Sequence, residues 1–173
     1  MASSFIVAHS DRRWCVLHTR ARHEKKVCLA CQSQGIPCYL PLRTHRTFSG
    51  GKVNTFLLPV FPGYVFAALG QNDFSSLKRT QSVAQRLDPP NQKQFIIEMN
   101  RVYQVEQTGM QIECAETLSM GQAVMVKSGP LSGLIGKVVR YKNRTRLQIE
   151  IAAIQKGILI EISRKNLVTM NEV

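Results

Sequence analysis

The chain has 173 residues and a formal net charge of +12, with 23 Lys and Arg against 11 Asp and Glu. Its hydrophobic content of 44% is enough for a folded core, so the composition excludes a disordered chain. The length allows one ordinary domain or two small ones, and the excess of positive charge favours a polyanionic partner such as nucleic acid.

The positive charge is unevenly distributed. Residues 1–60 carry a net charge of +7, residues 61–110 carry +1, and residues 111–173 carry +4. No apolar run is long enough to cross a membrane, and the N-terminal charges follow a short apolar patch, unlike those of a secretory signal. We therefore expect a cytoplasmic protein that does not bind membranes and keeps its cysteines reduced.

The first half of the chain predicts strands alternating with helices. A strand is expected at Trp14–Thr19, and a helix from about His23 that ends at Gly35, since glycine suits the left-handed position after a helix. Ile36–Leu42 reads as a second strand. The following segment reads as a hairpin with Gly50-Gly51 at or near its tip, a strong turn signal.

The stretch from Leu57 to Leu69, LLPVFPGYVFAAL, reads as a further buried strand, but Pro62-Gly63 interrupts it. Proline cannot donate a ladder hydrogen bond and glycine has no side chain to pack, so both weaken a central strand. We interpret the pair as a bend that brings Phe61 and Tyr64 to the surface.

Two helices are expected next, a short one from Asp73 and an amphipathic one at QKQFIIEMNRVYQVEQ after Asp88-Pro89-Pro90. With them, about the first 106 residues read as one α+β sandwich. Residues 108–118 lack a clear period and are interpreted as a linker. From Gly121 on, five short alternating strands with glycine turns predict a small β-barrel.

Three cysteines form a C-x2-C-x6-C run, with His23 nearby. A structural zinc site usually pairs two such knuckles, so we interpret Cys28, Cys31 and Cys38 as small apolar fillers and expect no metal and no cofactor.

Two blocks of sequence resemble the NusG family of transcription elongation factors. The first runs WCVLHTRARHEKKV, GIPCYLPLRTHRTFSGGK, LLPVFPGYVFAAL, and the second is GQAVMVKSGPLSGLIGKVV with a β-rich end. The resemblance implies an α+β N-terminal NusG-type domain, an antiparallel sheet flanked by helices, and a small all-β C-terminal KOW barrel. The expected division is a flexible N-terminal tail (1–12), the NusG-type domain (13–107), a linker (108–118) and the KOW domain (119–173).

Within the family, the runs R-H-E-K-K, Y-L-P-L and V-F-P-G-Y-V-F look most like the specialised antiterminators of the RfaH and UpxY kind. Those proteins serve particular operons, often polysaccharide gene clusters, while general NusG acts on most genes. The resemblance thus implies a monomeric factor that binds RNA polymerase and suppresses pausing or termination, with general NusG as the alternative.

The family binds the clamp helices of the polymerase β′ subunit through an apolar depression on its N-terminal domain. The aromatic density of the matching stretch fits such a surface, because aromatic side chains supply large contact area at small entropic cost. We expect the depression to include Val16, His18, Phe61, Pro62, Tyr64 and Phe66.

RfaH-like proteins also contact the non-template DNA strand through basic residues after the first strand and on the first helix. In this chain, the matching basic residues lie near the N-terminus of the first helix, where the helix dipole favours anions. Cations there gain nothing from the helix itself, so an external phosphate is a suitable partner, and a solvated charged face is the alternative. The expected nucleic-acid-binding residues are Arg20, Arg22, His23, Lys25 and Lys26.

In the KOW signature, general NusG carries phenylalanines that bind a ribosomal protein, whereas this chain has Leu131 and Leu134. We expect these leucines to contact a partner, either a ribosomal protein or a termination factor. The basic segment KNRTR nearby is either a solvated turn or an RNA contact. β-Branched strands and repeated glycines oppose a helical form of this domain.

Two other classes of protein come into question. KOW barrels also occur in ribosomal proteins, so an RNA-binding or ribosome-associated protein is the second alternative. An enzyme is not expected. The four histidines are scattered, and the sequence has neither paired carboxylates in a glycine-framed site nor a nucleophile elbow, so no catalytic group can be assigned.

Overall fold

The computed structural model describes residues 6–118 and 120–170. These residues fall into two compact units that divide between Ile96 and Ile97. We call residues 6–96 the N-terminal unit and residues 97–170 the C-terminal unit, and each is described by itself. Helix α3 (Gln92–Gln107) has the bounds predicted from its apolar stripe, and it begins in one unit and continues into the other.

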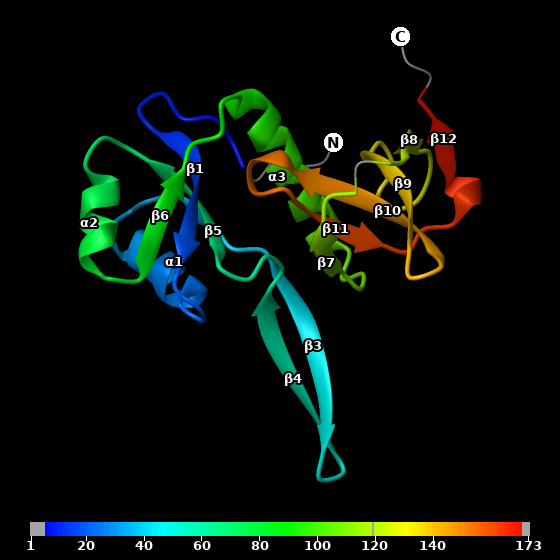
Figure 1. Ribbon diagram of the computed structural model, residues 1–173, viewed down its shortest axis with the longest axis horizontal. Helices are drawn as coiled ribbons and strands as arrows, with labels where there is room; N and C mark the ends of the chain where they lie inside the picture. Colours follow the sequence, from blue (N-terminus) through cyan, green and yellow to red (C-terminus); the bar gives the residue numbers. More distant parts are fainter. Residues whose placement is uncertain (1–5, 119, 171–173) are drawn as a thin grey trace. The chain divides into compact units, whose positions relative to one another are not determined.

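A four-stranded antiparallel sheet forms the centre of the N-terminal unit (Figure 1). Val16 on the central strand lies opposite Phe66 on one neighbouring strand and opposite Leu87 on the other. The central pair is buried along most of its length, as its apolar sequence predicts. In order across the sheet, the strands are β2 (Cys38–Tyr39), β5 (Tyr64–Leu69), β1 (Arg13–Thr19) and β6 (Val83–Leu87).

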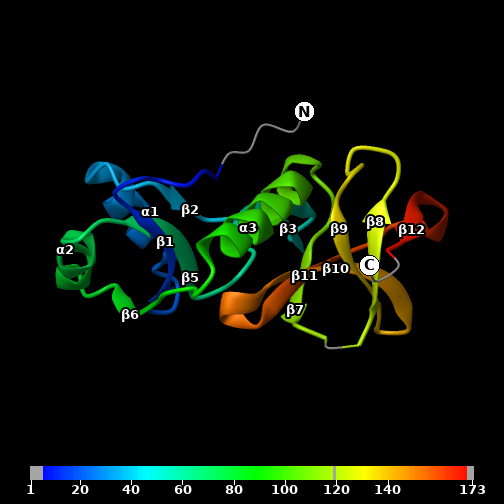
Figure 2. The ribbon, with the colours of Figure 1, turned by 90° about the horizontal axis from the view of Figure 1, so that it is seen from above.

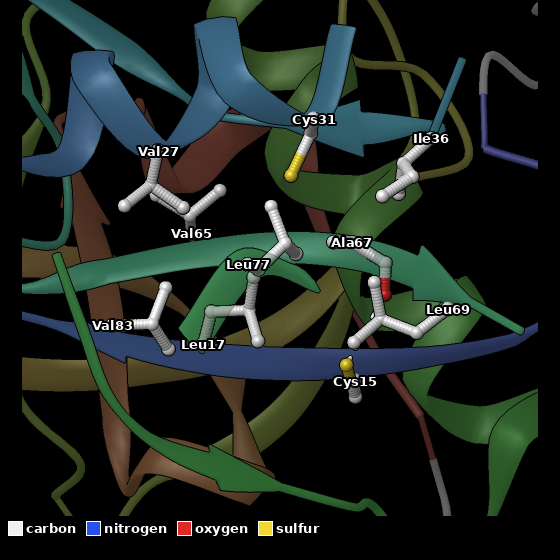
Figure 3. Close-up of a cluster of buried hydrophobic side chains, with 10 residues drawn as sticks. All are labelled: Cys15, Leu17, Val27, Cys31, Ile36, Val65, Ala67, Leu69, Leu77 and Val83. Carbon is white, nitrogen blue, oxygen red and sulfur yellow. Dashed lines mark hydrogen bonds between the residues drawn. The ribbon is translucent and has the colours of Figure 1, made fainter. Parts of the chain in front are cut away.

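One face of this sheet is covered by α1 (Glu24–Ser33) and α2 (Asp73–Arg79). Figure 3 shows Val27 and Cys31 of α1 and Leu77 of α2 among the side chains of β1 and β5. Alternate residues of a strand point to the same face of the sheet, so the side chains that β1 and β5 contribute to this core lie at every second position. The buried cluster comprises Cys15, Leu17, Val27, Cys31, Ile36, Val65, Ala67, Leu69, Leu77 and Val83.

Aromatic side chains occupy the other face of the sheet. The Phe66 ring lies 6.1 Å from Tyr39, 6.0 Å from Phe61 and 5.8 Å from Phe95, measured between ring centroids. The last two pairs meet edge to face, the favoured geometry for aromatic rings. Because Phe95 belongs to the first turns of α3, helices flank both faces, which confirms the predicted α+β class.

A long two-stranded hairpin leaves this sheet. It consists of β3 (Leu42–Ser49) and β4 (Lys52–Pro59), paired in register from Leu42 opposite Pro59 to Ser49 opposite Lys52. Figure 1 shows it extending away from the four-stranded sheet of the same unit. Gly50 and Gly51 form the tip with φ of +58° and +75°, so the predicted turn is confirmed; two consecutive positive φ values suit glycine.

The C-terminal unit contains one six-stranded antiparallel sheet, seen from above in Figure 2. Five of its strands are those predicted, and short 3-10 helices at Ala152–Ile154 and Arg164–Asn166 join the last three. In order across the sheet, the strands are β12 (Leu167–Thr169), β8 (Gln122–Val126), β9 (Ile135–Tyr141), β10 (Arg144–Ile151), β11 (Lys156–Ile160) and β7 (Glu113–Glu116).

Two segments differ from the expected division of the chain. The expected tail lies partly outside the described residues, but Ile6 is 1% exposed and Arg12 forms an ion pair of 2.9 Å with Asp73. The segment read as a linker contains β7, which pairs with β11 and extends the C-terminal sheet. Leu118 in the same segment exchanges main-chain hydrogen bonds with the buried side chain of Gln148.

The two predicted strands that contain prolines are interrupted. In the stretch Ile36–Leu42, β2 covers two residues, since Pro37 and Pro41 have no N–H to donate to a neighbouring strand. The stretch Leu57–Leu69 divides into the end of β4 and the whole of β5. The prediction of one strand there was wrong, and the break falls at the Pro62-Gly63 pair.

Candidate functional site

The turn between β4 and β5 is a tight one. The Tyr64 N–H donates to the Phe61 carbonyl over 3.1 Å, and the Gly63 carbonyl accepts from the Thr19 N–H over 2.8 Å. Gly63 has φ of +86°, a conformation that favours glycine. Pro62 therefore lies exposed at the outside of the turn, while the residues on either side are bonded to the sheet.

Glu24, the first residue of α1, holds this turn in place. Its carboxylate accepts a hydrogen bond of 2.7 Å from the Gly63 N–H, and the residue is 6% exposed. A hydrogen bond to a charged group contributes about 1.5–3 kcal/mol. The carboxylate also lies in the first helical turn, where the dipole favours negative charge. Sequence reasoning missed Glu24, although it stands among the cations of the R-H-E-K-K run.

His18 and Tyr64 lie beside the turn. Their rings stack with centroids 5.1 Å apart and planes at 23°, and the two residues oppose each other on β1 and β5. Both are half-buried. A Cβ added at Gly63 would lie 3.6 Å from the His18 ring, so the turn and the ring are in close contact. We call His18, Pro62 and Tyr64 the turn patch.

The other three residues expected at this surface are buried. Phe61 is 1% exposed, and Val16 and Phe66 are fully buried. The interpretation that the bend brings Phe61 to the surface is therefore corrected: its ring packs edge to face on Phe66. Val16 and Phe66 share a sheet face with His18 and Tyr64, so the turn patch is the accessible border of the aromatic face.

Four of the expected nucleic-acid-binding residues are exposed around the start of α1. Arg22 has φ of +63° in the turn where the His23 N–H donates to the Arg20 carbonyl over 3.1 Å. Within the described residues, none of Arg20, Arg22, Lys25 and Lys26 forms an ion pair, although the Lys25 ammonium donates to the Leu57 carbonyl over 2.8 Å. Their positive charge is thus uncompensated.

His23, the fifth expected residue, is half-buried and precedes the helix. Its Nδ1 is buried without a hydrogen-bond partner within the described residues. His23 is therefore less accessible than the cations that surround it in the sequence.

The two KOW leucines point inward. Leu131 and Leu134 are 3% and 1% exposed, and they close a turn in which the Leu134 N–H donates to the Leu131 carbonyl over 2.9 Å. The expectation of an apolar contact surface at these side chains is corrected, because they belong to the core of the C-terminal unit.

Most cations of the nearby basic segment are paired with glutamates. Lys142 is bonded to Glu113, and Arg146 lies 3.2 Å from Glu161. Arg144 is 3.9 Å from Glu161. These pairs are exposed in part and contribute little to stability, but they leave less free positive charge than the sequence suggests.

The cysteine run has two members on α1, Cys28 and Cys31, and one on β2, Cys38. Cys31 belongs to the buried core cluster and Cys38 packs against it, while the Sγ atoms of Cys28 and Cys38 lie 2.8 Å apart as free thiols. The hydrogen bond with Cys38, followed by burial, raises the pKa of Cys28; burial raises the pKa of Cys15 to about 12. Protonated thiols are poor ligands. In the described part of the chain, no group of three or more His, Cys, Asp or Glu side chains is arranged to hold a metal ion.

The N-terminal unit is thus an α+β domain with a half-buried pair of rings beside a tight turn and a cluster of exposed cations, and an all-β sheet follows in the C-terminal unit. Residues 12–106 match the model of the NusG family, described as "Transcription termination factor nusG". The chain therefore belongs to the NusG family of transcription factors. Its N-terminal unit lies almost wholly within the matched range, and the six-stranded sheet that follows is consistent with a KOW domain.

One of two solved structures reported for comparison supports this fold. One, titled "Domain interaction in Thermotoga maritima NusG", is 15% identical with a TM-score of 0.52, covering 92% of this chain and 98% of that chain. Another, "Crystal Structure of MjSpt4:Spt5 complex conformation B", is 18% identical with a TM-score of 0.30, covering 92% and 97%. A search of curated proteins found no match. None of the helices in the described ranges has the length and apolar character needed to span a bilayer.

Proposed function

We propose that the protein is a non-enzymatic elongation factor that binds RNA polymerase through the turn patch and suppresses pausing or termination. The observation that carries the proposal is the turn itself. A buried carboxylate, Glu24, fixes Gly63, and this leaves Pro62 and the stacked His18–Tyr64 pair accessible in one place. Stacked rings held by a rigid turn lose little entropy on binding, as expected of an interface anchor.

The proposed contact on the polymerase is the pair of β′ clamp helices, which the resemblance to the family implies. Apolar side chains of these helices would pack against Pro62 and the Tyr64 ring. The buried members of the expected set, Val16, Phe61 and Phe66, then support the patch from below and do not touch the partner.

We propose that the exposed cations Arg20, Arg22, Lys25 and Lys26 contact the non-template DNA strand of the elongation complex. They lie on the turn and helix that follow β1, and Glu24 in the same helix holds the turn patch. Contacts with phosphates of this kind give affinity that decreases steeply with salt. They position the strand without reading its sequence.

The binding claim is tested by the affinity of the purified full-length protein for RNA polymerase. We expect Tyr64→Ala to weaken binding by about tenfold or more, equivalent to ~1.4 kcal/mol. Tyr141→Ala is the matched control, because Tyr141 is also a partly exposed strand tyrosine but lies in the C-terminal unit. Equal affinities of the two variants would refute the proposed surface.

Within the family we propose the specialised role, with a particular operon such as a polysaccharide gene cluster as the target. The runs R-H-E-K-K and V-F-P-G-Y-V-F support it. Gene position tests this proposal: a place at the head of such a cluster supports the specialist, and a place beside translocation and ribosomal-protein genes supports general NusG. A pull-down that enriches ribosomal subunits without polymerase would instead indicate a ribosome-associated protein.

A further inference from the structure

The β3–β4 hairpin has no structural role that accounts for its side chains. Among the described residues the two strands pair only with each other, and nearly every residue from Thr44 to Leu58 is exposed. Five of its exposed residues are large and apolar, and Phe48 near the tip is 81% exposed. These are Phe48, Val53, Phe56, Leu57 and Leu58. A stable fold does not require such a surface, so a partner that covers it is expected.

The charge of the hairpin selects the class of partner. Arg43, Arg46 and Lys52 are its charged residues, and no Asp or Glu occurs from Leu42 to Pro59. Within the described residues, none of these cations takes part in an ion pair. Three uncompensated positive charges on an element without a carboxylate are complementary to a polyanion.

The register distributes the side chains over both faces of the ribbon. Residues directly opposite in an antiparallel pair share a face, and alternate residues along a strand share it too. One face therefore carries Thr44, Arg46, Phe48, Val53, Thr55 and Leu57. The other carries Arg43, His45, Lys52, Asn54, Phe56 and Leu58.

Each face thus carries a mixture of apolar side chains with cations, hydroxyls or amides. Protein interfaces tend to have an apolar core with charged groups depleted from it, which neither face provides. Arg, Asn and Thr are instead residue types that contact phosphates and base edges in protein–DNA complexes, and Phe is one of the types that contact the thymine methyl group.

The dimensions of the hairpin fit the major groove of a double helix. Paired strands lie about 4.8 Å apart, and eight paired positions at about 3.3 Å each give a ribbon roughly 26 Å long. The major groove of DNA is about 12 Å wide and admits a two-stranded ribbon. Side chains on both faces would then meet both walls of the groove.

The base of the hairpin is joined to the cations of α1. The Lys25 ammonium donates a hydrogen bond of 2.8 Å to the Leu57 carbonyl, so the first turn of α1 and strand β4 are in direct contact. Arg22 and Lys26 extend the positive charge beyond that contact.

From these observations we propose that the β3–β4 hairpin binds duplex DNA in the major groove, with Arg43, Arg46 and Lys52 on the phosphates. This DNA is distinct from the single strand proposed for the cations of α1. The inference does not depend on polymerase binding, since the hairpin would bind a duplex in the absence of polymerase.

The test is the affinity of the full-length protein for a short fluorescein-labelled DNA duplex, measured by fluorescence anisotropy over a range of salt concentrations. The hairpin variant carries Arg43→Gln, Arg46→Gln and Lys52→Gln. The control variant carries Lys78→Gln, Arg79→Gln and Lys93→Gln, which removes the same charge from exposed residues outside the hairpin. Circular dichroism checks that both variants are folded.

We expect the hairpin variant to bind the duplex at least about tenfold more weakly, and its log–log salt slope to decrease by about 0.9 for each phosphate that the protein no longer neutralises. The control variant should keep the wild-type slope, and the hairpin variant should keep its affinity for polymerase. Equal slopes for the two variants would overturn the proposal, as would a hairpin variant that loses affinity only for the corresponding single strand. Weaker polymerase binding with unchanged duplex affinity would also overturn it and would assign the hairpin to a protein partner.

Discussion

At the residue scale, the contact between Glu24 and Gly63 is the one on which the turn patch depends. A carboxylate on α1 and a main-chain N–H between two strands are joined over 2.7 Å, although they are far apart in the sequence. A buried N–H that is deprived of its acceptor carries the full cost of desolvation. Helix, turn and patch are therefore expected to respond together to a change at Glu24.

We predict that Glu24→Ala lowers the free energy of unfolding by about 1.5–3 kcal/mol, because it leaves the Gly63 N–H without an acceptor. Glu24→Gln should be less destabilising, since the amide oxygen can still accept that hydrogen bond. Urea unfolding of the two variants measures the difference. Equal destabilisation by alanine and glutamine would contradict the assigned role of the acceptor.

A second prediction concerns Phe61, which the sequence suggested as an interface residue and the structure buries. Phe61→Ala should destabilise the N-terminal unit by about 3–5 kcal/mol, the usual cost of removing a buried phenyl ring. Pro62→Ala, one residue further on at an exposed position, should change stability far less. Thermal unfolding followed by circular dichroism distinguishes them, and a Phe61→Ala protein as stable as the wild type would contradict the assignment.

The sequence identified the residues of the candidate site better than it identified their exposure. The cations around α1 were expected at the surface and are there, because a charged side chain is rarely buried. Aromatic and aliphatic residues serve equally well in a core and at an interface, so Phe61, Phe66 and Leu134 were misplaced. Alternation showed which residues share a face, but only the fold shows which faces are covered.

At the scale of elements, the long periodic segments were predictable and the short ones were not. Helix α3 has a stripe over four turns and the hairpin has a Gly-Gly tip, so both follow from local signals. The strands β6 and β7 are five and four residues long and were missed. Each pairs with a single neighbour among the described strands, and such pairing is determined by tertiary contacts that a short window does not contain.

The C-terminal sheet depends on glycines that lie against a neighbouring strand. A Cβ at Gly136 would lie 2.7 Å from the Gln148 carbonyl, which is closer than real contacts allow. We predict that Gly136→Ala destabilises the C-terminal unit by about 1–3 kcal/mol, in the range found for overpacked cores. Gly70→Ala is the control, since its nearest neighbour is an ordinary 3.4 Å away. Similar unfolding curves for both variants would show that the sheet accommodates the methyl group.

At the scale of the whole molecule, the surfaces proposed to bind polymerase and DNA all lie on the N-terminal unit. The N-terminal unit holds the turn patch, the free cations of α1 and the hairpin, whereas the cations of the C-terminal segment are largely paired with glutamates. The net charge of +12 is therefore most available for nucleic acid on the N-terminal unit. Membership of the NusG family is shown by the match over residues 12–106.

The central claim is that the turn patch lets this protein act on elongating RNA polymerase. Single-round transcription through a pause site and a terminator tests it most directly, with the wild-type protein and the folded Tyr64→Ala variant. The wild type should shorten the pause and increase read-through, and the variant should do neither at the same concentration. A wild-type protein that leaves both unchanged, or a variant as active as the wild type, would contradict the account.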